Sequence, residues 1–251
     1  MIQMEKLSKR YGGQMVLEDI GLKIDEGKLT AFIGPNGAGK STLLSIISRL
    51  LPKEEGILYI RGIELESWNS VELAKELSML KQKIDYQVKM TVEELVSFGR
   101  YPYSKGRLTR EDQIQIDQAI AYMDLDPYRK RPIDQLSGGQ LQRVNIAMIL
   151  SQDTDIVLLD EPLNNLDLKQ GSLMMKTLRR LVEELGKTVV VVIHDINVAS
   201  QFADQIVAFK DGKVFCSGKP EQVMTQEVLE DLFEMKLTIA EVNGKKICLY
   251  E

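Results

Sequence analysis

The sequence predicts an α/β fold with a mostly parallel sheet, antiparallel strands at the ends and an inserted helical subdomain. Three observations support this class. The apolar runs 29–33 and 156–160 are typical of buried parallel strands, which are covered on both faces. Helical patterns alternate with such runs along the chain. The stretch from about residue 84 to residue 150, by contrast, is rich in helical patterns and poor in strand patterns.

The size of the chain suits one domain with a subdomain. At 251 residues it can bury a sizeable core. We expect a single domain over residues 1–251, in which residues 1–83 and 151–251 form the α/β core. Residues from about 84 to 150 then form the helical subdomain.

Charge, cysteines and apolar runs narrow the class further. The 32 basic and 37 acidic residues form no basic block, which argues against a nucleic-acid partner. Cys216 and Cys248 stand alone, as expected for reduced thiols in a cytosolic protein. Residues 1–10 lack the apolar core of a signal peptide, and the aliphatic run 189–193 is far too short to span a bilayer. We therefore expect any membrane role to come through a partner.

The strands are predicted from alternation and from turn signals. Ile20, Leu22 and Ile24 alternate with small or polar residues, which indicates a half-buried strand over residues 16–24. Asp211-Gly212 predicts a tight turn. The remaining predicted strands cover residues 2–7, 29–33, 56–60, 77–80, 156–160, 188–193, 205–209 and 213–217, with a hairpin through Asn243-Gly244 within residues 237–250.

The helices are predicted from caps and apolar spacing. Thr109, followed by Glu111 and Asp112, is a plausible N-cap, and Ser137 is another. Residues 100–106 are predicted as a loop from their Pro, Ser and Gly content. The predicted helices cover residues 91–99, 109–125, 138–151, 168–185 and 220–235, besides one that follows residue 42 and carries an apolar face.

A glycine-rich stretch between the strand 29–33 and the following helix matches G-x-x-x-x-G-K-[ST] at every defined position. Glycines let backbone N–H groups approach phosphates, and the next helix directs its positive end at them. Lys40 is expected to reach the β- and γ-phosphates and Ser41 to ligate Mg²⁺. The sequence therefore predicts a P-loop NTPase core. Its nucleotide-binding residues are Gly34, Pro35, Asn36, Gly37, Ala38, Gly39, Lys40, Ser41 and Thr42.

Two carboxylates follow the apolar strand 156–160. Asp160 at the strand end is suited to hold Mg²⁺, and Glu161 can orient a water and accept its proton. An ordinary acidic strand end is the alternative. The phosphate loop in the same chain favours the functional interpretation.

Ser137, Gly138, Gly139 and Gln140 open a helix with uncovered amides, and so form a second potential anion site. From the local sequence alone, an ordinary Ser-capped helix remains the simpler interpretation. If the site is functional, it covers the nucleotide of another chain in a head-to-tail dimer.

Tyr11 also has two interpretations. It is either an aromatic residue of a turn or a surface on which adenine stacks.

Together and in this order, the motifs resemble the ATP-binding subunits of ABC transporters over nearly the whole chain. Residues 34–42 match Walker A, residues 136–140 the LSGGQ signature, and residues 156–161 Walker B with the catalytic glutamate. Further family positions are matched by Gln82 in the Q-loop, residues 164–167 in the D-loop, His194 as the switch histidine and Tyr11 as the stacking aromatic.

The resemblance implies an ABC ATPase that hydrolyses ATP with Mg²⁺. It assigns catalytic roles to Glu161, His194, Gln82 and Lys40, and places Asp167 near the dimer axis. The implied Mg²⁺ ligands are Ser41, Gln82 and Asp160, and the residues implied to bind the nucleotide of the opposite chain are Ser137, Gly138, Gly139 and Gln140. Two departures are visible: the D-loop is N-N-L-D rather than S-A-L-D, and Leu141 follows LSGGQ where a polar residue is more usual.

The stretch 96–103, which contains G-R-Y-P, resembles ATPases that serve iron–siderophore, haem and cobalamin importers. Residues 160–167 and 194–197 resemble the iron(III)–siderophore branch, with a catecholate such as petrobactin as the suggested chelate. The implied partners are a second copy in the ATP-bound state, two membrane-spanning permease subunits and, indirectly, an extracellular or periplasmic siderophore-binding protein. The implied location is the cytoplasmic side of the cell membrane. Alternatives are an importer ATPase for haem, cobalamin or another substrate, an ABC ATPase outside transport, and a nucleotide-binding module without turnover.

Overall fold

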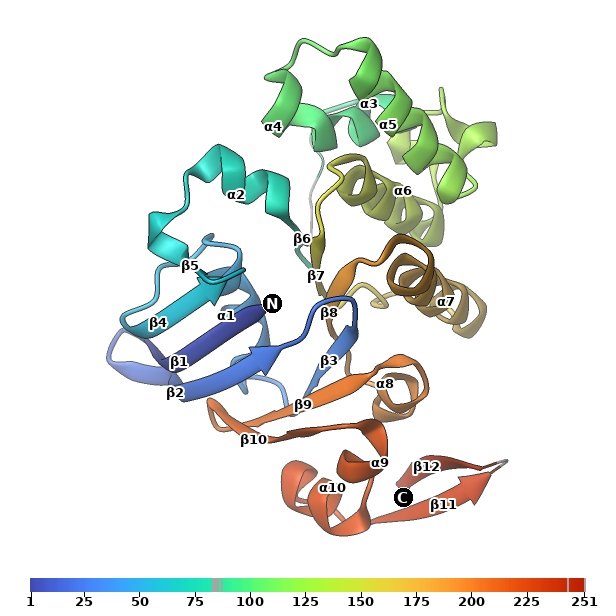
Figure 1. Ribbon diagram of the computed structural model, residues 1–251. Helices are drawn as coiled ribbons and strands as arrows, with labels where there is room; N and C mark the ends of the chain where they lie inside the picture. Colours follow the sequence, from blue (N-terminus) through green and yellow to red (C-terminus); the bar gives the residue numbers. More distant parts are fainter. Residues whose placement is uncertain (83–85, 87, 243, 251) are drawn as a thin grey trace. The chain divides into compact units, whose positions relative to one another are not determined.

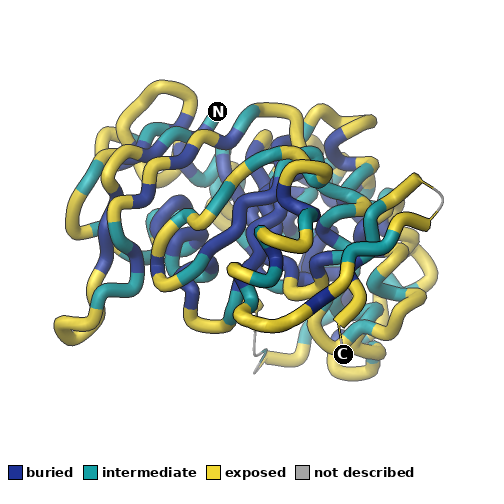
Figure 2. The backbone as a smooth tube through the Cα atoms, turned by 90° about the horizontal axis from the view of Figure 1, so that it is seen from below, coloured by how far each residue is buried: buried dark blue, intermediate teal, exposed yellow. Residues whose placement is uncertain are grey.

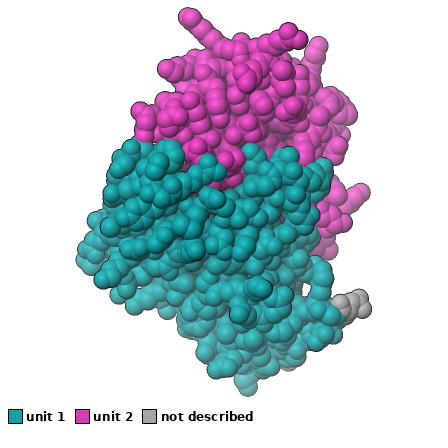
Figure 3. Space-filling model, viewed as in Figure 1, with its two compact units in different colours: residues 1–68, 178–251 teal, residues 69–177 magenta. Residues whose placement is uncertain are grey.

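The computed structural model describes residues 1–82, 86, 88–242 and 244–250. The chain forms two compact units, which Figure 3 colours separately. Unit 1 contains Met1–Trp68 and Leu178–Glu251, and unit 2 contains Asn69–Thr177. Helix α7 (Leu168–Leu185) contributes residues to both units and has the bounds predicted from the sequence.

Unit 1 contains an antiparallel sheet with the strand order β2-β1-β4-β5 (Figure 1). Strand β1 pairs with both β2 and β4, so that Ile2 lies opposite Ile24 on one side. The predicted alternation is confirmed, because Ile20, Leu22 and Ile24 are buried while the residues between them are exposed. The strands are β1 (Ile2–Tyr11), β2 (Gln14–Ile24), β4 (Glu55–Ile60) and β5 (Ile63–Glu64).

A second sheet supplies the buried centre of unit 1. Strand β3 runs parallel to both β8 and β9, and β9 pairs with β10 in the antiparallel sense. Every residue of β3 is buried, and the rings of Phe32 and Phe209 lie 4.9 Å apart. Figure 2 shows buried backbone in the interior and exposed residues in the turns. The strands are β3 (Leu29–Ile33), β8 (Thr188–Val192), β9 (Gln205–Lys210) and β10 (Lys213–Gly218).

The turn between β9 and β10 is held against β2. The N–H of Glu18 donates to the carbonyl of Gly212 at 2.8 Å. A Cβ added at Gly212 would lie 2.7 Å from the carbonyl oxygen of Val16. The remaining elements of unit 1 are α1 (Lys40–Ile47), the 3₁₀ helix η1 (Leu65–Ser67), α8 (Ile196–Phe202), α9 (Pro220–Val223), α10 (Gln226–Phe233), β11 (Leu237–Val242) and β12 (Lys245–Tyr250).

Unit 2 combines a parallel strand pair with helices. Strands β6 (Leu77–Leu80) and β7 (Ile156–Asp160) pair in register from Leu77 opposite Ile156 to Leu80 opposite Leu159. Helices α3, α5 and α6 pack against one another. The helices are α2 (Ser70–Glu76), α3 (Val92–Ser97), α4 (Tyr101–Ser104), α5 (Arg110–Tyr122) and α6 (Gly138–Ser151), with 3₁₀ turns η2 (Phe98–Arg100), η3 (Asp126–Tyr128) and η4 (Ile133–Gln135).

Capping boxes begin the three packed helices. Thr91, Thr109 and Ser137 each accept a hydrogen bond from the backbone three residues later, and the side chain at that later position accepts one in return. The caps predicted at Thr109 and Ser137 are thus confirmed. The caps satisfy backbone N–H groups that the first helical turn leaves without partners.

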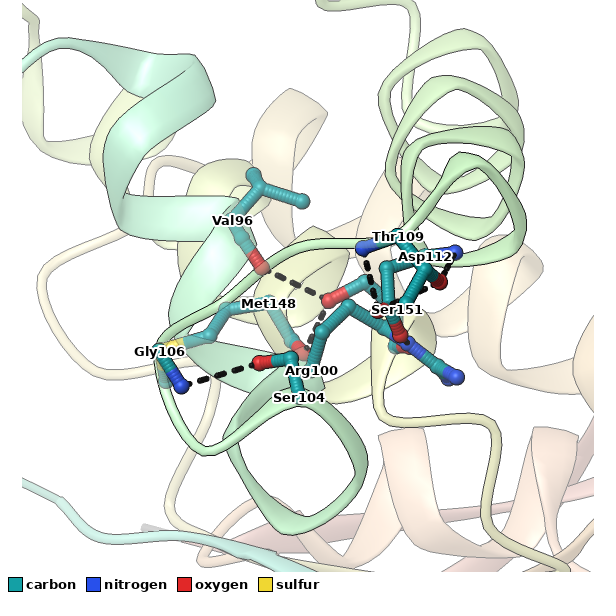
Figure 4. Close-up of polar contacts among 8 residues, drawn as sticks. All are labelled: Val96, Arg100, Ser104, Gly106, Thr109, Asp112, Met148 and Ser151. Carbon is teal, nitrogen blue, oxygen red and sulfur yellow. Dashed lines mark hydrogen bonds and ion pairs between the residues drawn. The ribbon is translucent and has the colours of Figure 1, made fainter.

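A buried ion pair joins three segments of unit 2 (Figure 4). Arg100 donates through Nε to Oδ1 of Asp112 at 2.9 Å and through Nη1 to the carbonyl of Ser151 at 2.8 Å. Arg100 and Asp112 are 5% and 2% exposed. A Cβ at Gly99 would lie 2.1 Å from the carbonyl oxygen of Met148, so only glycine fits there. The G-R-Y-P stretch is therefore fixed against α5 and α6.

The structure corrects several predicted elements. The loop predicted over residues 100–106 contains the helical turn α4, because Pro102 lies near its start, where proline favours a helix. The predicted helix 220–235 is two helices, since Thr225 caps a separate α10. Helices α2 and α8 were not predicted, because seven residues are too few for a clear period. The predicted subdomain start at residue 84 and the turn residue Asn243 lie outside the described residues.

Candidate functional site

The predicted phosphate loop lies between β3 and α1 in unit 1. Gly34 and Gly39 have φ angles of 133° and 96°, which favour glycine. A Cβ at Gly34 would lie 2.1 Å from the carbonyl oxygen of Phe209, and one at Gly39 would lie 2.8 Å from that of Val16. Packing of the surrounding strands therefore requires both glycines.

Lys40 begins α1 and is 5% exposed. Its Nζ donates to the carbonyls of Gly34 and Pro35, both at 2.8 Å, so the ammonium group lies against the loop. Gly39 precedes the helix without a side-chain cap. The first amides of α1 and the Lys40 ammonium thus provide donors and positive charge at one place, as phosphate binding requires.

His194 lies at the same edge of the sheet as the phosphate loop. Phe32 of β3 lies opposite Val192 of β8, so the two parallel strands end together. The loop follows β3 directly, and the exposed His194 lies two residues after the end of β8. The topology therefore places the phosphate loop and His194, which are far apart in the sequence, after neighbouring strand ends.

Tyr11 ends β1 and is 49% exposed. Nζ of Lys9 lies 5.6 Å from the centroid of its ring. The exposed ring is available as a stacking surface, which is the property that the sequence interpretation needs.

Glu161 is held by two side-chain amides in unit 2. Nε2 of Gln82 donates to Oε2 of Glu161 at 2.5 Å, and Nδ2 of Asn164 donates to the same oxygen. Strands β6 and β7 end at one edge, which explains why Gln82 and Glu161 meet. Glu161 has a φ of 52°, a strained value for a non-glycine residue and one that is common at functional sites.

Asp160 ends β7 and is 7% exposed. Its carboxylate, the Ser41 hydroxyl and the Gln82 amide oxygen are hard oxygen donors, so their chemistry fits Mg²⁺. Among the described residues, three or more His, Cys, Asp or Glu side chains do not gather into a metal site. Mg²⁺ commonly binds through one or two carboxylates together with substrate phosphates and waters.

The predicted second anion site opens α6. Oγ of Ser137 accepts from the N–H of Gln140 at 3.3 Å, and Oε1 of Gln140 accepts from the N–H of Ser137 at 2.9 Å. A Cβ at Gly138 would meet no described heavy atom within 4 Å, whereas one at Gly139 would lie 3.2 Å from Cγ of Gln170. The packing of this chain therefore does not demand a glycine at position 138.

Several contacts that hold this part of unit 2 were not predicted from the sequence, although Asn164 was assigned to the D-loop. Asn164 contacts Glu161, and Nε2 of Gln142 donates to the carbonyl of Pro162 at 3.0 Å. Tyr86 donates to Oδ1 of Asn145 on α6 at 2.6 Å, and burial raises the pKa of Tyr86 to about 12, so it remains a donor. The sequence feature that could have indicated the Asn164 contact is its amide, three residues after Glu161.

In the D-loop, Oδ1 of Asp167 accepts a hydrogen bond from the N–H of Gln170 at 2.8 Å.

The comparisons with known proteins agree with this geometry. The family model described as ABC transporter matches residues 17–164. The petrobactin import ATP-binding protein YclP of Bacillus subtilis (strain 168) is 52% identical over 250 residues, covering 100% of this chain and 99% of that protein. The iron(3+)-hydroxamate import ATP-binding protein FhuC of the same organism is 39% identical over 249 residues, covering 98% and 93%.

Solved structures share the fold. The dimeric structure of a post-hydrolysis state of the ATP-binding cassette MJ0796, bound to ADP and Pi, has a TM-score of 0.77 and 35% identity, covering 88% of this chain and 99% of that one. Helices of membrane-spanning length and hydropathy do not occur in the described part of this chain.

The glycine-rich loop between β3 and α1, with its buried lysine, defines a nucleoside-triphosphate-binding protein of the P-loop class. The chain belongs to the ABC transporter family, and within that family it is an ATPase.

Proposed function

We propose that this chain is the ATP-binding subunit that powers import of an iron(III)–siderophore complex across a bacterial cell membrane. Full-length similarity to import ATP-binding proteins for petrobactin and iron(3+)-hydroxamate supports the transport role. The Gln82–Glu161 hydrogen bond carries the proposal of hydrolysis, because it joins a candidate base to the residue that would orient its water.

Nucleotide binding is assigned to the phosphate loop and to Tyr11. The amides of the phosphate loop and the Lys40 ammonium hold the phosphates, and the exposed ring of Tyr11 stacks on adenine. Ser41, Asp160 and Gln82 would hold Mg²⁺, which would neutralise negative charge on the phosphates. The loop contributes through Gly34, Pro35, Asn36, Gly37, Ala38, Gly39, Lys40, Ser41 and Thr42.

Hydrolysis is assigned to Glu161, Gln82, His194 and Lys40. Glu161 accepts a proton from the attacking water, whose oxygen bonds to the γ-phosphorus as the bond to ADP breaks. Gln82 positions Glu161 and the water. His194 and Lys40 stabilise negative charge on the γ-phosphate as the bond breaks.

A second copy of the chain completes each site in the proposed cycle. Ser137, Gly138, Gly139 and Gln140 contact the nucleotide held by the opposite copy, and Asp167 lies near the axis between copies. The space around Gly138 supports this assignment, since a partner group can approach its backbone closely. The dimeric state of the cassette MJ0796 is a precedent. ATP stabilises the closed dimer, and hydrolysis allows it to open.

The proposed membrane partners are two permease subunits, with a siderophore-binding protein acting through them. In this arrangement the chain lies peripherally on the cytoplasmic side of the membrane. Phe98 and Tyr101, which are 56% and 62% exposed beside the fixed Arg100, offer apolar surface for such contacts.

Two measurements test the proposal. Phosphate release by the purified chain should depend on ATP and Mg²⁺ and should fall below one hundredth in Glu161→Gln, while binding of ATP remains. Uptake of radioactive iron–petrobactin should be restored when the chain replaces YclP in Bacillus subtilis, and Glu161→Gln should not restore it. A chain that binds ATP without hydrolysing it would contradict the proposal of an ATPase motor.

A further inference from the structure

The side chain of Asn197 pairs with the main chain of the C-terminal hairpin. Its Nδ2 donates to the carbonyl of Cys248 at 3.0 Å, and its Oδ1 accepts from the N–H of Cys248 at 2.7 Å. Cys248 belongs to β12 and lies opposite Ile239 of β11. The amide therefore satisfies both backbone groups of one strand residue, as a neighbouring strand would. We call these two hydrogen bonds the Asn197 clamp.

The clamp begins close to His194. Asp195 follows His194 and caps α8, because its Oδ1 accepts from the N–H groups of Asn197 at 2.8 Å and Val198 at 3.1 Å. Burial raises the pKa of the Cys248 thiol, and the negative charge of Asp195 raises it further. Asn197, three residues after His194, therefore joins the start of α8 to the hairpin.

The turn end of the hairpin and the end of α8 border an open space. A cavity of about 990 Å³ is lined by residues of α8, of the α9 segment and of the hairpin itself, among them Gln201, Gln222, Glu241 and Lys245. Nζ of Lys246 donates to the carbonyl of Glu221 at 2.9 Å, and both residues also line this space. Helix α8 packs against β12, where Cys248 is buried, and the two hydrogen bonds of the clamp fix the direction of this contact.

We propose that Asn197 is a positioning residue for ATP hydrolysis, which fixes the start of α8 to the C-terminal hairpin and so orients the segment that carries His194. The inference rests on the proposed role of His194 in hydrolysis. Displacement of a reacting group by about 1 Å can cost two orders of magnitude in rate, so the loss of the clamp should affect turnover more than binding. The hairpin then serves as a support for the γ-phosphate end of the site.

Kinetics of variants in α8 form the first part of the test. Asn197→Ala removes both clamp bonds, and Asn197→Asp keeps the acceptor but removes the donor to Cys248. We expect kcat for ATP to fall about tenfold in Asn197→Ala and less in Asn197→Asp, with KM within about twofold of the original. Gln201→Ala, an exposed change on the same helix, is the matched control and should leave both constants unchanged.

Thiol reactivity forms the second part. In a Cys216→Ser background, Cys248 is the sole cysteine, and its 3% exposure predicts slow alkylation by N-ethylmaleimide. Asn197→Ala should accelerate alkylation about tenfold. If the clamp couples the hairpin to the nucleotide site, ATP and Mg²⁺ must in turn protect Cys248, and Asn197→Ala must abolish that protection.

The outcomes separate the possible errors. Faster alkylation of Cys248 with unchanged kcat would show that Asn197 only fastens the hairpin, and would overturn the inference. Equal losses in Asn197→Ala and Gln201→Ala would overturn it too. If Asn197→Ala does not fold, as judged by circular dichroism, Asn197→Asp decides by the same criteria. Absence of hydrolysis in the unchanged chain would instead count against the proposed function, while nucleotide protection of Cys248 would still report the coupling.

Discussion

At the scale of single residues, Gly39 and Gly138 differ in whether the surrounding residues leave room for a side chain. Gly39 combines a positive φ with backbone and side-chain atoms where its Cβ would lie. Gly138 has neither constraint from the described residues of its own chain. The fold of the loop thus requires Gly39, while the described residues of this chain leave room for a side chain at Gly138.

This contrast predicts different effects of the same substitution. Gly39→Ala should weaken ATP binding at least tenfold, because the new Cβ would lie 2.5 Å from Cδ2 of Leu17. Gly138→Ala should leave the melting temperature within about 2 °C and ATP affinity unchanged, yet lower hydrolysis at least tenfold. Calorimetry, nucleotide titration and phosphate release measure the three quantities. A Gly138→Ala protein with full activity would contradict the proposed contact with a second copy.

Asn164 gives a second prediction at this scale. Its amide donates to the carboxylate of Glu161, and a hydrogen bond to a charged group contributes about 1.5–3 kcal/mol. Gln82 still holds the same oxygen in Asn164→Ala. We therefore expect the low end of that range, about a tenfold fall in kcat with unchanged KM, in steady-state phosphate release. A raised KM with unchanged kcat would assign Asn164 to nucleotide binding instead.

At the scale of elements, the buried pair of Arg100 and Asp112 holds the helical part of unit 2 together. Asp112 also completes the capping box of α5, since its Oδ2 accepts from the N–H and the hydroxyl of Thr109 at 2.9 and 2.8 Å. The Asp112 carboxylate therefore takes part both in the ion pair with Arg100 and in the cap of α5. The G-R-Y-P stretch depends on it for its position.

Asp112→Ala should lower the free energy of unfolding by about 3–5 kcal/mol, because it leaves a buried guanidinium without its partner. Urea denaturation followed by circular dichroism measures the change. Glu111→Ala, one residue earlier and exposed, should change the free energy by less than about 1 kcal/mol. Equal effects of the two substitutions would show that the ion pair does not support the unit.

The same pair predicts a dependence on pH. Burial alone would raise the pKa of Asp112, but hydrogen bonds from the Thr109 N–H, Arg100 and the Thr109 hydroxyl bring it below its ordinary value. The ionised carboxylate therefore contributes stability above the unfolded pKa of about 4, and this is lost as pH falls through the lower folded pKa. The difference in unfolding free energy between the original chain and Asp112→Asn should shrink across that range. A constant difference would contradict the lowered pKa.

Helices and strands could be predicted where the sequence pattern that indicates them lies among neighbouring residues. Caps at Thr109 and Ser137, the alternation in β2 and the apolar strands β3 and β7 follow from neighbouring residues, and the structure has them as predicted. The pairing of Asn197 with Cys248 joins residues 51 positions apart, and no local pattern announces it. Helix α4 was missed because its Pro and Ser favour a turn as well as a helix start.

At the scale of the whole molecule, the proposed cycle requires two copies. The motif residues could be predicted from sequence because the chemistry of phosphate binding fixes residue types at close spacing. Roles that involve a second copy or a permease depend on surfaces outside one chain. They therefore need a measurement on the assembled protein.

Glu161→Gln should form dimers in ATP and Mg²⁺ and remain monomeric without them, because ATP bound between copies stabilises the closed state and slow hydrolysis preserves it. Size-exclusion chromatography with light scattering measures the mass. Adding Ser137→Glu, which places a negative charge at the proposed phosphate contact, should abolish the dimer. A dimer that persists with Ser137→Glu would contradict the shared site. A monomer in every condition, even with permease subunits co-expressed, would contradict ATP-driven closure.

The turn at Gly212 has a practical consequence for protein engineering. Hairpin tips are usually chosen for inserted epitopes and fluorescent labels, because loops tolerate added residues. Here the tip lies against Val16 and accepts a hydrogen bond from Glu18, and the same Val16 carbonyl lies beneath Gly39 of the phosphate loop. An epitope inserted at residues 211–212 would displace the strand that supports the loop, so labels belong elsewhere on the chain.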